Sequence, residues 1–273
     1  MIRNNKPILF ATLGLFGGVC GVALGEFIPE FGGSLFRNIA HVAIWSAFCG
    51  GGIAVALFTA SEIYHRRRGF YSKQILGYLR AGAYGGAIAG AVAQAIYGTQ
   101  MLSPDAQNLV LRPLCWGLMG AILGWRLAST IPNLTPARAV GAGGIGGTLG
   151  GVAFLAAGAL LPAAFGRMAG IGALGAALGI AIVVVDSIFR EATLEIIWAP
   201  KEVTTVGLGG NMVTIGGGDD HIYVAGLSRK AAGVVIEQGK IQYVDTASGQ
   251  RTDLRDGSRL KIGSIEIVVH ATP

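Results

Sequence analysis

The stretch that decides the fold runs from Met168 to Phe189 and reads MAGIGALGAALGIAIVVVDSIF. It contains one charged side chain, Asp186, close to its end. A helix needs about 20 apolar residues to cross the roughly 30 Å of hydrocarbon in a bilayer. The stretch therefore predicts a membrane-spanning helix, with Gly170, Gly172, Gly175 and Gly179 spread along it.

The rest of the N-terminal part resembles this stretch in composition. The chain is 52% hydrophobic and 13% charged, against about 25% charged residues in a soluble domain. Its first apolar segment follows Arg3 and Lys6, a pattern that a signal peptide also shows. We favour an uncleaved span, because the same glycine-rich pattern recurs downstream, and a cleaved signal peptide is the alternative. We expect a polytopic helical bundle of about six spans: Pro7–Gly25, Ile39–Ala60, Ile75–Gly98, Leu114–Ser129, Ala139–Leu161 and Met168–Phe189.

Basic residues mark alternate loops of this bundle. Met1–Lys6, Tyr64–Lys73 and Trp125–Arg138 are basic, and Lys and Arg are retained on the cytoplasmic side of a membrane. The pattern predicts a multi-pass protein of the bacterial inner membrane with both termini in the cytoplasm. The net charge of +6 arises in this apolar part, so no nucleic-acid partner is expected. The strongest anchors, expected to meet anionic lipid headgroups, are Arg66, Arg67 and Arg68.

The 45 glycines predict close helix packing. Lipid tails are as apolar as leucine, so membrane helices associate where small residues let backbones approach. The spans form three glycine-rich hairpins, an apparent internal repeat, with Arg37, Arg112 or Arg167 before each second helix. The same glycine faces are also suited to contacts between copies of the chain, so a homo-oligomer is a further possible partner. The expected packing positions are Gly86, Gly90, Gly117, Gly120, Gly124, Gly147, Gly151, Gly175 and Gly179.

The composition changes after Phe189, which divides the chain into a helical domain (1–190) and a β-domain (191–273). Short β-type runs alternate with turns such as Gln238-Gly239 and Asp256-Gly257, a pattern typical of a sandwich. The expected core residues are Tyr223, Leu227, Ile236, Tyr243, Leu254, Leu260 and Ile267. The expected strands are Leu194–Trp198, Glu202–Val206, Met212–Ile215, Ile222–Val224, Gly233–Glu237, Lys240–Val244, Arg259–Ile262 and Ile265–His270.

Four motifs of this tail resemble the forkhead-associated (FHA) domain. They are Val213–Gly216, Asp220–Val224, Leu227–Arg229 and Leu254–Gly263, which follow the order and spacing of the family. The combination with glycine-rich spans also resembles bacterial multi-span proteins that carry a cytoplasmic FHA tail. The resemblance implies an all-β sandwich that binds proteins through the loops at one end.

FHA domains bind phosphothreonine peptides through an Arg and a Ser, and this chain keeps only part of that set. Ser228 matches the family's Ser, whereas Gly217 stands at the place of the Arg and Ala231 at that of a supporting His. Losing one charge-assisted hydrogen bond costs about 1.5–3 kcal/mol. We therefore expect phosphate-independent protein binding, with a phosphoprotein partner as the alternative. The candidate partner-binding residues are Ser228, Arg229, Lys230, Gly217, Gln250 and Arg251.

An enzyme is the least expected class. The four histidines form no catalytic motif, and Cys20, Cys49 and Cys115 lack metal-ligand spacing, so no catalytic residue, metal or cofactor is predicted. No acidic residue or histidine falls at mid-membrane, as ion-driven transport would require. The sequence thus predicts a membrane-anchored scaffold that presents an FHA-like domain to a cytoplasmic protein. A channel or transporter regulated by its tail is the alternative.

Overall fold

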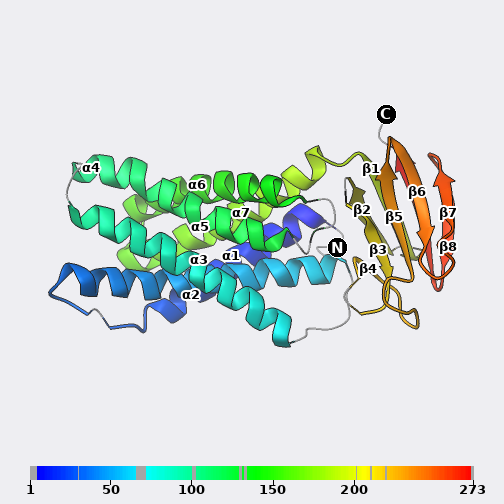
Figure 1. Cartoon of the computed structure of the whole chain (residues 1–273). Coiled ribbons are helices and arrows are strands. Elements are labelled where there is room, and N and C mark those ends of the chain that lie inside the picture. The colour runs from blue at the N-terminus through cyan, green and yellow to red at the C-terminus, as the bar shows by residue number, and fades with distance from the viewer. Residues whose placement is uncertain are drawn as a thin grey trace.

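A computed structural model describes residues 5–29, 31–65, 72–99, 103–128, 131, 134–200, 202–209, 211–218 and 220–271. A long helical bundle forms one end of the molecule and a β-sandwich forms the other (Figure 1). The predicted headgroup anchors Arg66, Arg67 and Arg68 lie outside the described residues.

Four helices of the bundle, α1, α2, α6 and α7, are long and apolar enough to cross a membrane. The other two long helices, α3 and α5, fall outside this set, and α5 has only 16 residues. A membrane protein is therefore supported, whereas the predicted count of about six spans is not confirmed, because four helices meet the requirements of length and composition. The long helices within the described residues are α1 (Lys6–Gly25), α2 (Leu35–Tyr64), α3 (Ser72–Thr99), α5 (Arg112–Leu127), α6 (Pro136–Leu160) and α7 (Ala163–Ile188).

Polar caps and prolines set the helix starts. The Asn5 side chain accepts a hydrogen bond from the Ile8 amide at the start of α1, and Ser34 accepts one from the Arg37 amide at the start of α2. A short helix α4 (Pro104–Ala106) and a π-helical turn η2 (Gln107–Leu111) precede α5. Pro113 has no N–H to offer the preceding turn, which favours the wider π-helical geometry there.

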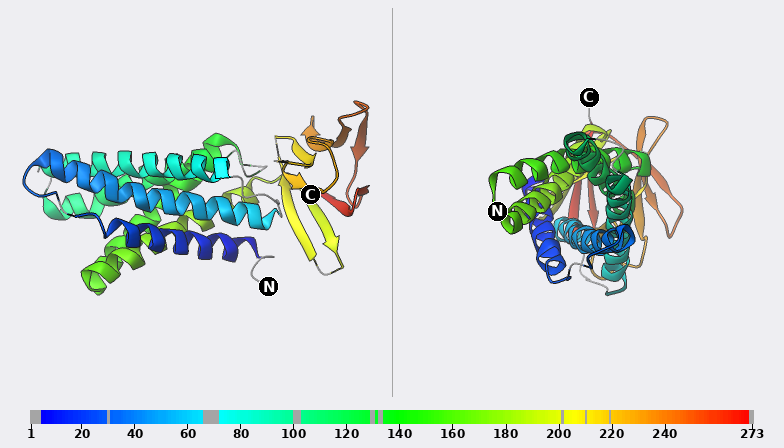
Figure 2. Two further views of the ribbon diagram at one scale, coloured as in Figure 1. Left: turned by 90° about the horizontal axis from the view of Figure 1, so that it is seen from below. Right: turned by 90° about the vertical axis from the view of Figure 1, so that its left-hand side faces the viewer.

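The six long helices form a closed ring in the order α1, α2, α3, α5, α6, α7, with α7 packed again on α1 (Figure 2, right). Two of the predicted hairpins, α1–α2 and α6–α7, pack along much of their length. The middle hairpin does not, because α3 packs mainly on α2 and α5 mainly on α6. Most glycines of this middle hairpin explain the difference, because they face helices outside it. Gly82, Gly86 and Gly90 of α3 lie against α2, and those of α5 that lie against α6 are Gly117, Gly120 and Gly124.

Each predicted packing glycine lies against a neighbouring helix. A Cβ added at Gly120 would clash with the Gly143 carbonyl, and one at Gly175 with the Gly14 carbonyl. A Cβ at Gly86 would meet the Ser46 carbonyl of α2. These contacts require glycine because the backbones themselves touch. The remaining positions, Gly90, Gly117, Gly124, Gly147, Gly151 and Gly179, abut Val42, Thr148, Ala139, Trp116, Pro113 and Phe10 respectively.

The C-terminal region folds into two stacked sheets. One sheet has the strand order β2-β1-β9-β8 and the other β4-β3-β5-β6-β7. Neighbouring strands run antiparallel except for β3 and β4. The strands are β1 (Ala192–Ala199), β2 (Glu202–Leu208), β3 (Val213–Gly216), β4 (Ile222–Tyr223), β5 (Ala232–Glu237), β6 (Lys240–Asp245), β7 (Arg251–Leu254), β8 (Arg259–Ile262) and β9 (Ile265–Ala271).

The sequence missed strand β7 and misplaced one core residue. Strand β7 lies at a sheet edge and only Leu254 of it is buried, so it lacks the apolar alternation that marks a strand. Tyr223 was expected in the core but is half-buried, because Ile222 and Val224 point inward on either side of it. Ile267 is fully buried as expected, and Leu227, Ile236, Tyr243 and Leu260 pack at the edge of the core.

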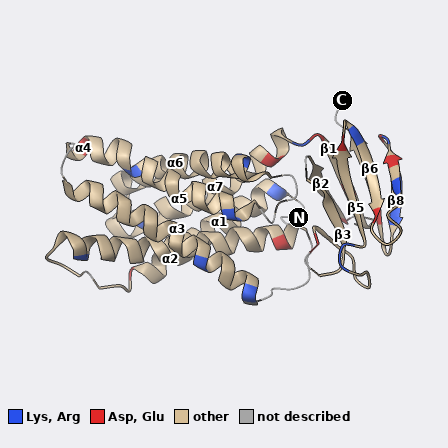
Figure 3. Cartoon of the chain, viewed as in Figure 1, with Lys and Arg blue, Asp and Glu red and all other residues tan. Residues whose placement is uncertain are grey.

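A hydrogen bond connects the sandwich to one end of the bundle. The Tyr64 hydroxyl at the end of α2 donates to the Thr205 carbonyl in β2 at 2.9 Å. At the same end, Lys6 and Asp186 form a nearly buried ion pair of 2.6 Å between α1 and α7. The start of α1 and the sandwich thus share this end, called the sandwich end below. Charged residues are sparse along the bundle and dense on the sandwich (Figure 3).

Candidate functional site

Four of the predicted partner-binding residues lie together at one edge of the sandwich. Ser228, Arg229 and Lys230 are exposed in the loop between β4 and β5. The amide of Gly217, which directly follows β3, donates to the Ser228 carbonyl at 2.9 Å. This hydrogen bond joins the two loops. Gly217 itself is buried, and the exposed side chains of Ser228, Arg229 and Lys230 beside it form one surface, called the basic loop surface below.

A buried carboxylate that the sequence analysis did not single out holds this surface in shape. Asp220 is 5% exposed, and its Oδ2 accepts a hydrogen bond of 2.6 Å from the Lys230 amide. Lys230 has a φ of 49°, a left-handed conformation that non-glycine residues seldom adopt. The Asp220 bond offsets that local cost and fixes the direction of the loop. Because Asp220 belongs to an FHA-like motif, the motif was the available signal for it.

Gly217, where the resemblance to the FHA domain would place an arginine, is sterically closed to a side chain. A Cβ at Gly217 would meet the carbonyl oxygen of Leu227, so no larger side chain fits without a backbone shift. Arg229 occupies the neighbouring space instead, where its Nε lies 2.6 Å from the place of a Cβ on Gly218. An arginine is therefore present at this edge of the sandwich, on the loop between β4 and β5 and not at Gly217.

Gln250 and Arg251 have different surroundings. The loop of Gln250 is tied to the basic loop surface by a hydrogen bond of 3.1 Å from the Thr246 amide to the Ala231 carbonyl. Arg251 lies in β7 and pairs with Glu237 at 2.6 Å on the outer face of its sheet. The structure thus brings together Gly217, Ser228, Arg229 and Lys230. Gln250 lies in the loop between β6 and β7, and an ion pair holds Arg251 on the outer face of its sheet.

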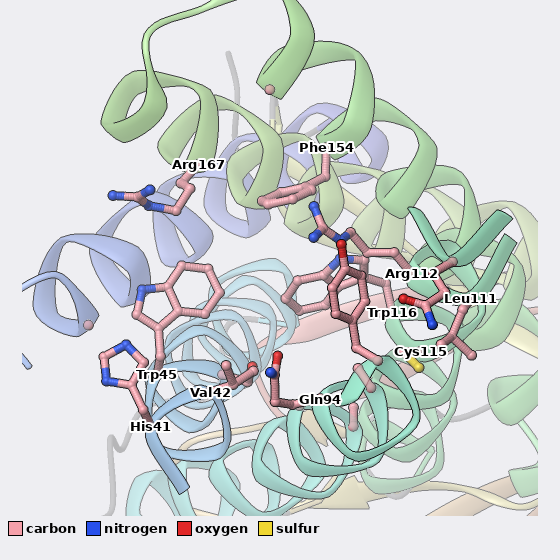
Figure 4. Close-up of a pocket in the computed structure, with 18 of the residues that line it drawn as sticks. His41, Val42, Trp45, Gln94, Leu111, Arg112, Cys115, Trp116, Phe154 and Arg167 are labelled. Carbon is pink, nitrogen blue, oxygen red and sulfur yellow. The ribbon is translucent and has the colours of Figure 1, made fainter. Parts of the chain in front are cut away.

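A second candidate site, the distal pocket, lies at the end of the bundle remote from the sandwich. It is a cavity of about 560 Å³, within the range of small-molecule sites. All six helices of the ring line it, so it lies inside the ring (Figure 4). Its polar and aromatic lining includes His41, Trp45, Ser46, Gln94, Tyr97, Gln107, Arg112, Trp116 and Arg167.

Two arginines give the pocket a positive character. Arg167 is neutralised by Glu26, to which its Nε and Nη2 donate at 2.7 and 2.6 Å. These hydrogen bonds from Arg167 hold the pKa of the Glu26 carboxyl below its ordinary value. Arg112 instead lies over the ring of Phe154, 5.9 Å from its centre, and no carboxylate pairs with it among the residues that the structure describes. Among the described lining residues, Arg112 therefore contributes a positive charge that no carboxylate neutralises.

Apolar side chains close the pocket toward the middle of the bundle. The helix faces that line it continue inward with Ile53, Met119, Leu123 and Leu174, each at most 1% exposed. Such side chains pack at the density of an organic solid and leave no space for a chain of water. The distal pocket is therefore shaped as a binding cavity with one end closed.

Comparison with protein-family models, curated proteins and solved structures finds no match to this chain. Within the described ranges, no three His, Cys, Asp or Glu side chains gather in a way that could hold a metal ion. The sequence alone does not indicate the distal pocket, because its lining comes from six separate helices. The one signal was the recurrence of Arg112 and Arg167 at the same place in two hairpins.

Proposed function

We propose that this chain is a membrane-anchored interaction protein whose FHA-like sandwich recruits a cytoplasmic protein. One observation carries the proposal: the basic loop surface exposes Ser228, Arg229 and Lys230 on a backbone fixed by Asp220. Exposed polar residues on rigid loops are the usual means by which a sandwich binds a partner. The apolar helices would hold that surface at the membrane and raise its local concentration there.

The closed position at Gly217 favours a partner recognised without phosphate. Phosphate binding uses convergent charged donors, and the family's arginine cannot be placed at Gly217 without a backbone shift. A phosphoprotein is the alternative partner, because the exposed guanidinium of Arg229 is a group that binds phosphate. Both versions require the sandwich to face the cytoplasm, which the basic loops of the sequence predict.

A crosslinking pull-down from native membranes tests this function. We expect a partner to be recovered with the wild-type chain, with or without phosphatase treatment, and lost with the double variant Arg229→Glu/Lys230→Glu. Lys240→Glu is the matched control, because Lys240 is exposed on the β5–β6 hairpin, remote from the basic loop surface. Equal recovery with the double variant, or a reporter fusion that places the C-terminus outside the cytoplasm, would contradict the proposal.

A channel or transporter is the second candidate, and the distal pocket is the observation that favours it. A cavity inside a ring of helices could be the entrance to a pore. The packed layer of Ile53, Met119 and Leu123 argues against conduction in this conformation. Ion flux through proteoliposomes containing the full chain, absent from protein-free vesicles, would establish the channel in place of the scaffold.

A further inference from the structure

Two buried hydrogen-bond donors that find no acceptor among the described residues belong to side chains that border the distal pocket. Gln107 is 3% exposed and Trp116 is 8% exposed, and both line the pocket. Gln107 Nε2 and Trp116 Nε1 find no hydrogen-bond partner within the described part of the chain. Buried polar groups are nearly always paired, because leaving one unpaired destabilises the fold. Two such donors in one cavity point to a ligand that supplies the acceptors.

The third donor in the pocket carries a charge. Arg112 directly follows the π-helical turn that contains Gln107, and Trp116 lies one helical turn further along α5. Figure 4 shows Arg112 beside Phe154, with Trp45, His41 and Gln94 across the pocket. Guanidinium and indole groups can only donate hydrogen bonds, so the matching ligand group must accept them. A guanidinium fits an oxyanion best, because two of its N–H groups can bond two oxygens at once.

The remaining lining adds an apolar requirement. The lining also includes Phe154, Leu111, Val42 and Ala93, which offer no hydrogen bonds from their side chains. Glu26, the one carboxylate among the described lining residues, is held by Arg167 and does not compete for Arg112. The cavity thus combines one unneutralised cation, two neutral donors and an apolar wall.

We propose that the distal pocket binds an oxyanion, a phosphate or carboxylate group attached to an apolar body, through Arg112, Gln107 and Trp116. The oxyanion accepts hydrogen bonds from all three residues, and its apolar body lies against Phe154 and Leu111. The same chemistry is offered by the headgroup of an anionic lipid and by a free organic anion. This site stands apart from the basic loop surface, which lies on the sandwich at the other end of the bundle.

The test uses the purified full chain in an uncharged detergent, followed by tryptophan fluorescence, since Trp45 and Trp116 line the pocket. One arm titrates sodium phosphate and sodium benzoate against sodium chloride at equal ionic strength. The other titrates short-chain phosphatidylglycerol against phosphatidylcholine. We expect a saturable change in at least one arm. A response to phosphate or benzoate assigns a free anion, a response to phosphatidylglycerol alone assigns a lipid headgroup, and no response in either arm overturns the proposal.

Three variants distinguish binding from a structural role. Arg112→Gln should weaken the affinity that the fluorescence titration measures about tenfold or more, because a charge-assisted hydrogen bond is lost. Arg37→Gln, the matched control, removes an exposed charge from the same end of the bundle and should leave the response unchanged. Equal responses of these two variants would refute the site.

Gln107→Leu keeps the proposal testable if Arg112→Gln fails to fold. It removes a buried donor that has no protein acceptor, so the Tm of the ligand-free protein should stay the same or rise while the response weakens. A purely structural Gln107 would instead lower that Tm. A variant that keeps the full response would also refute the assignment.

Discussion

The helical bundle and the β-sandwich achieve tight packing by different means. In the bundle, backbone touches backbone, as where Gly120 meets Gly143 and Gly175 meets Gly14. In the sandwich, branched side chains such as Ile215, Val234 and Ile267 fill the space between two sheets. Membrane helices gain little from burying apolar surface away from lipid, whereas a soluble sandwich depends on it. The two regions should therefore differ in which substitutions they tolerate.

The largest effect is expected where a side chain is added between two helices. Gly143→Leu would place a side chain against the backbone of α5 at Gly120, so the two helices would have to separate. We expect the free energy of unfolding to fall by more than about 4 kcal/mol. The monodisperse peak in size-exclusion chromatography should also be lost. Gly141→Leu is the control on the same helix, since a Cβ there meets nothing within 4 Å. Equal behaviour of the two variants would show that α5 and α6 do not pack as described.

A smaller effect is expected where a side chain is removed from the sandwich. Ile267→Ala leaves a cavity at a fully buried position and should lower the free energy of unfolding of the sandwich by about 2–5 kcal/mol. Hydrogen exchange of the full chain should show faster exchange in β1, β8 and β9 and unchanged exchange in the bundle. Lys261→Ala, at an exposed position of β8, should leave exchange unchanged. Faster exchange in the bundle as well would mean that the two regions unfold as one unit.

The bond between the two regions contributes less than either core. Tyr64→Phe keeps the buried ring but removes the hydroxyl that donates to the Thr205 carbonyl and accepts from the Thr205 amide. A loss of about 1 kcal/mol is expected, seen as faster exchange of the Thr205 amide. Tyr84→Phe, on an exposed side chain of α3, provides the control. An unchanged Thr205 amide would mean that this hydrogen bond does not hold the sandwich in place.

The contrast between the regions also explains what the sequence could predict. The strands were predictable because apolar residues alternate along them, as Leu194 and Ile196 do in β1. The edge strand β7 was not, because Arg251, Thr252 and Asp253 are exposed and form no alternation. In the bundle, a glycine indicated that another backbone comes close but did not identify which helix supplies it.

Helix α6 illustrates this limit. Gly143, Gly147 and Gly151 face α5, whereas Gly146 and Gly150 face α7. The sequence shows six glycines from Gly143 to Gly151 and does not show that five of them form two stripes with different partners. The distal pocket was hidden for the same reason, because its lining depends on how the ring closes. Only the recurring arginines at its rim could be recognised beforehand.

The smallest effect is expected from the ion pair at the pocket rim, where neither kind of core packing contributes. Glu26 and Arg167 are both partly exposed, so their pair should stabilise the bundle by less than about 1 kcal/mol. Because the pKa of Glu26 is lowered in the folded protein, its contribution is present above the unfolded carboxyl's pKa. It is lost as the pH falls through the lowered folded value.

The Tm of the wild-type chain should therefore exceed that of Arg167→Gln slightly at pH 7, and the difference should shrink toward pH 3. Arg37→Gln removes an exposed arginine from the same end of the bundle and controls for the change in net charge. A difference that grows at low pH would mean that Arg167 acts on the bundle without Glu26. Arg167 would then stabilise the pocket rim through helix packing, as contacts do in the packed part of the bundle, and not through its charge.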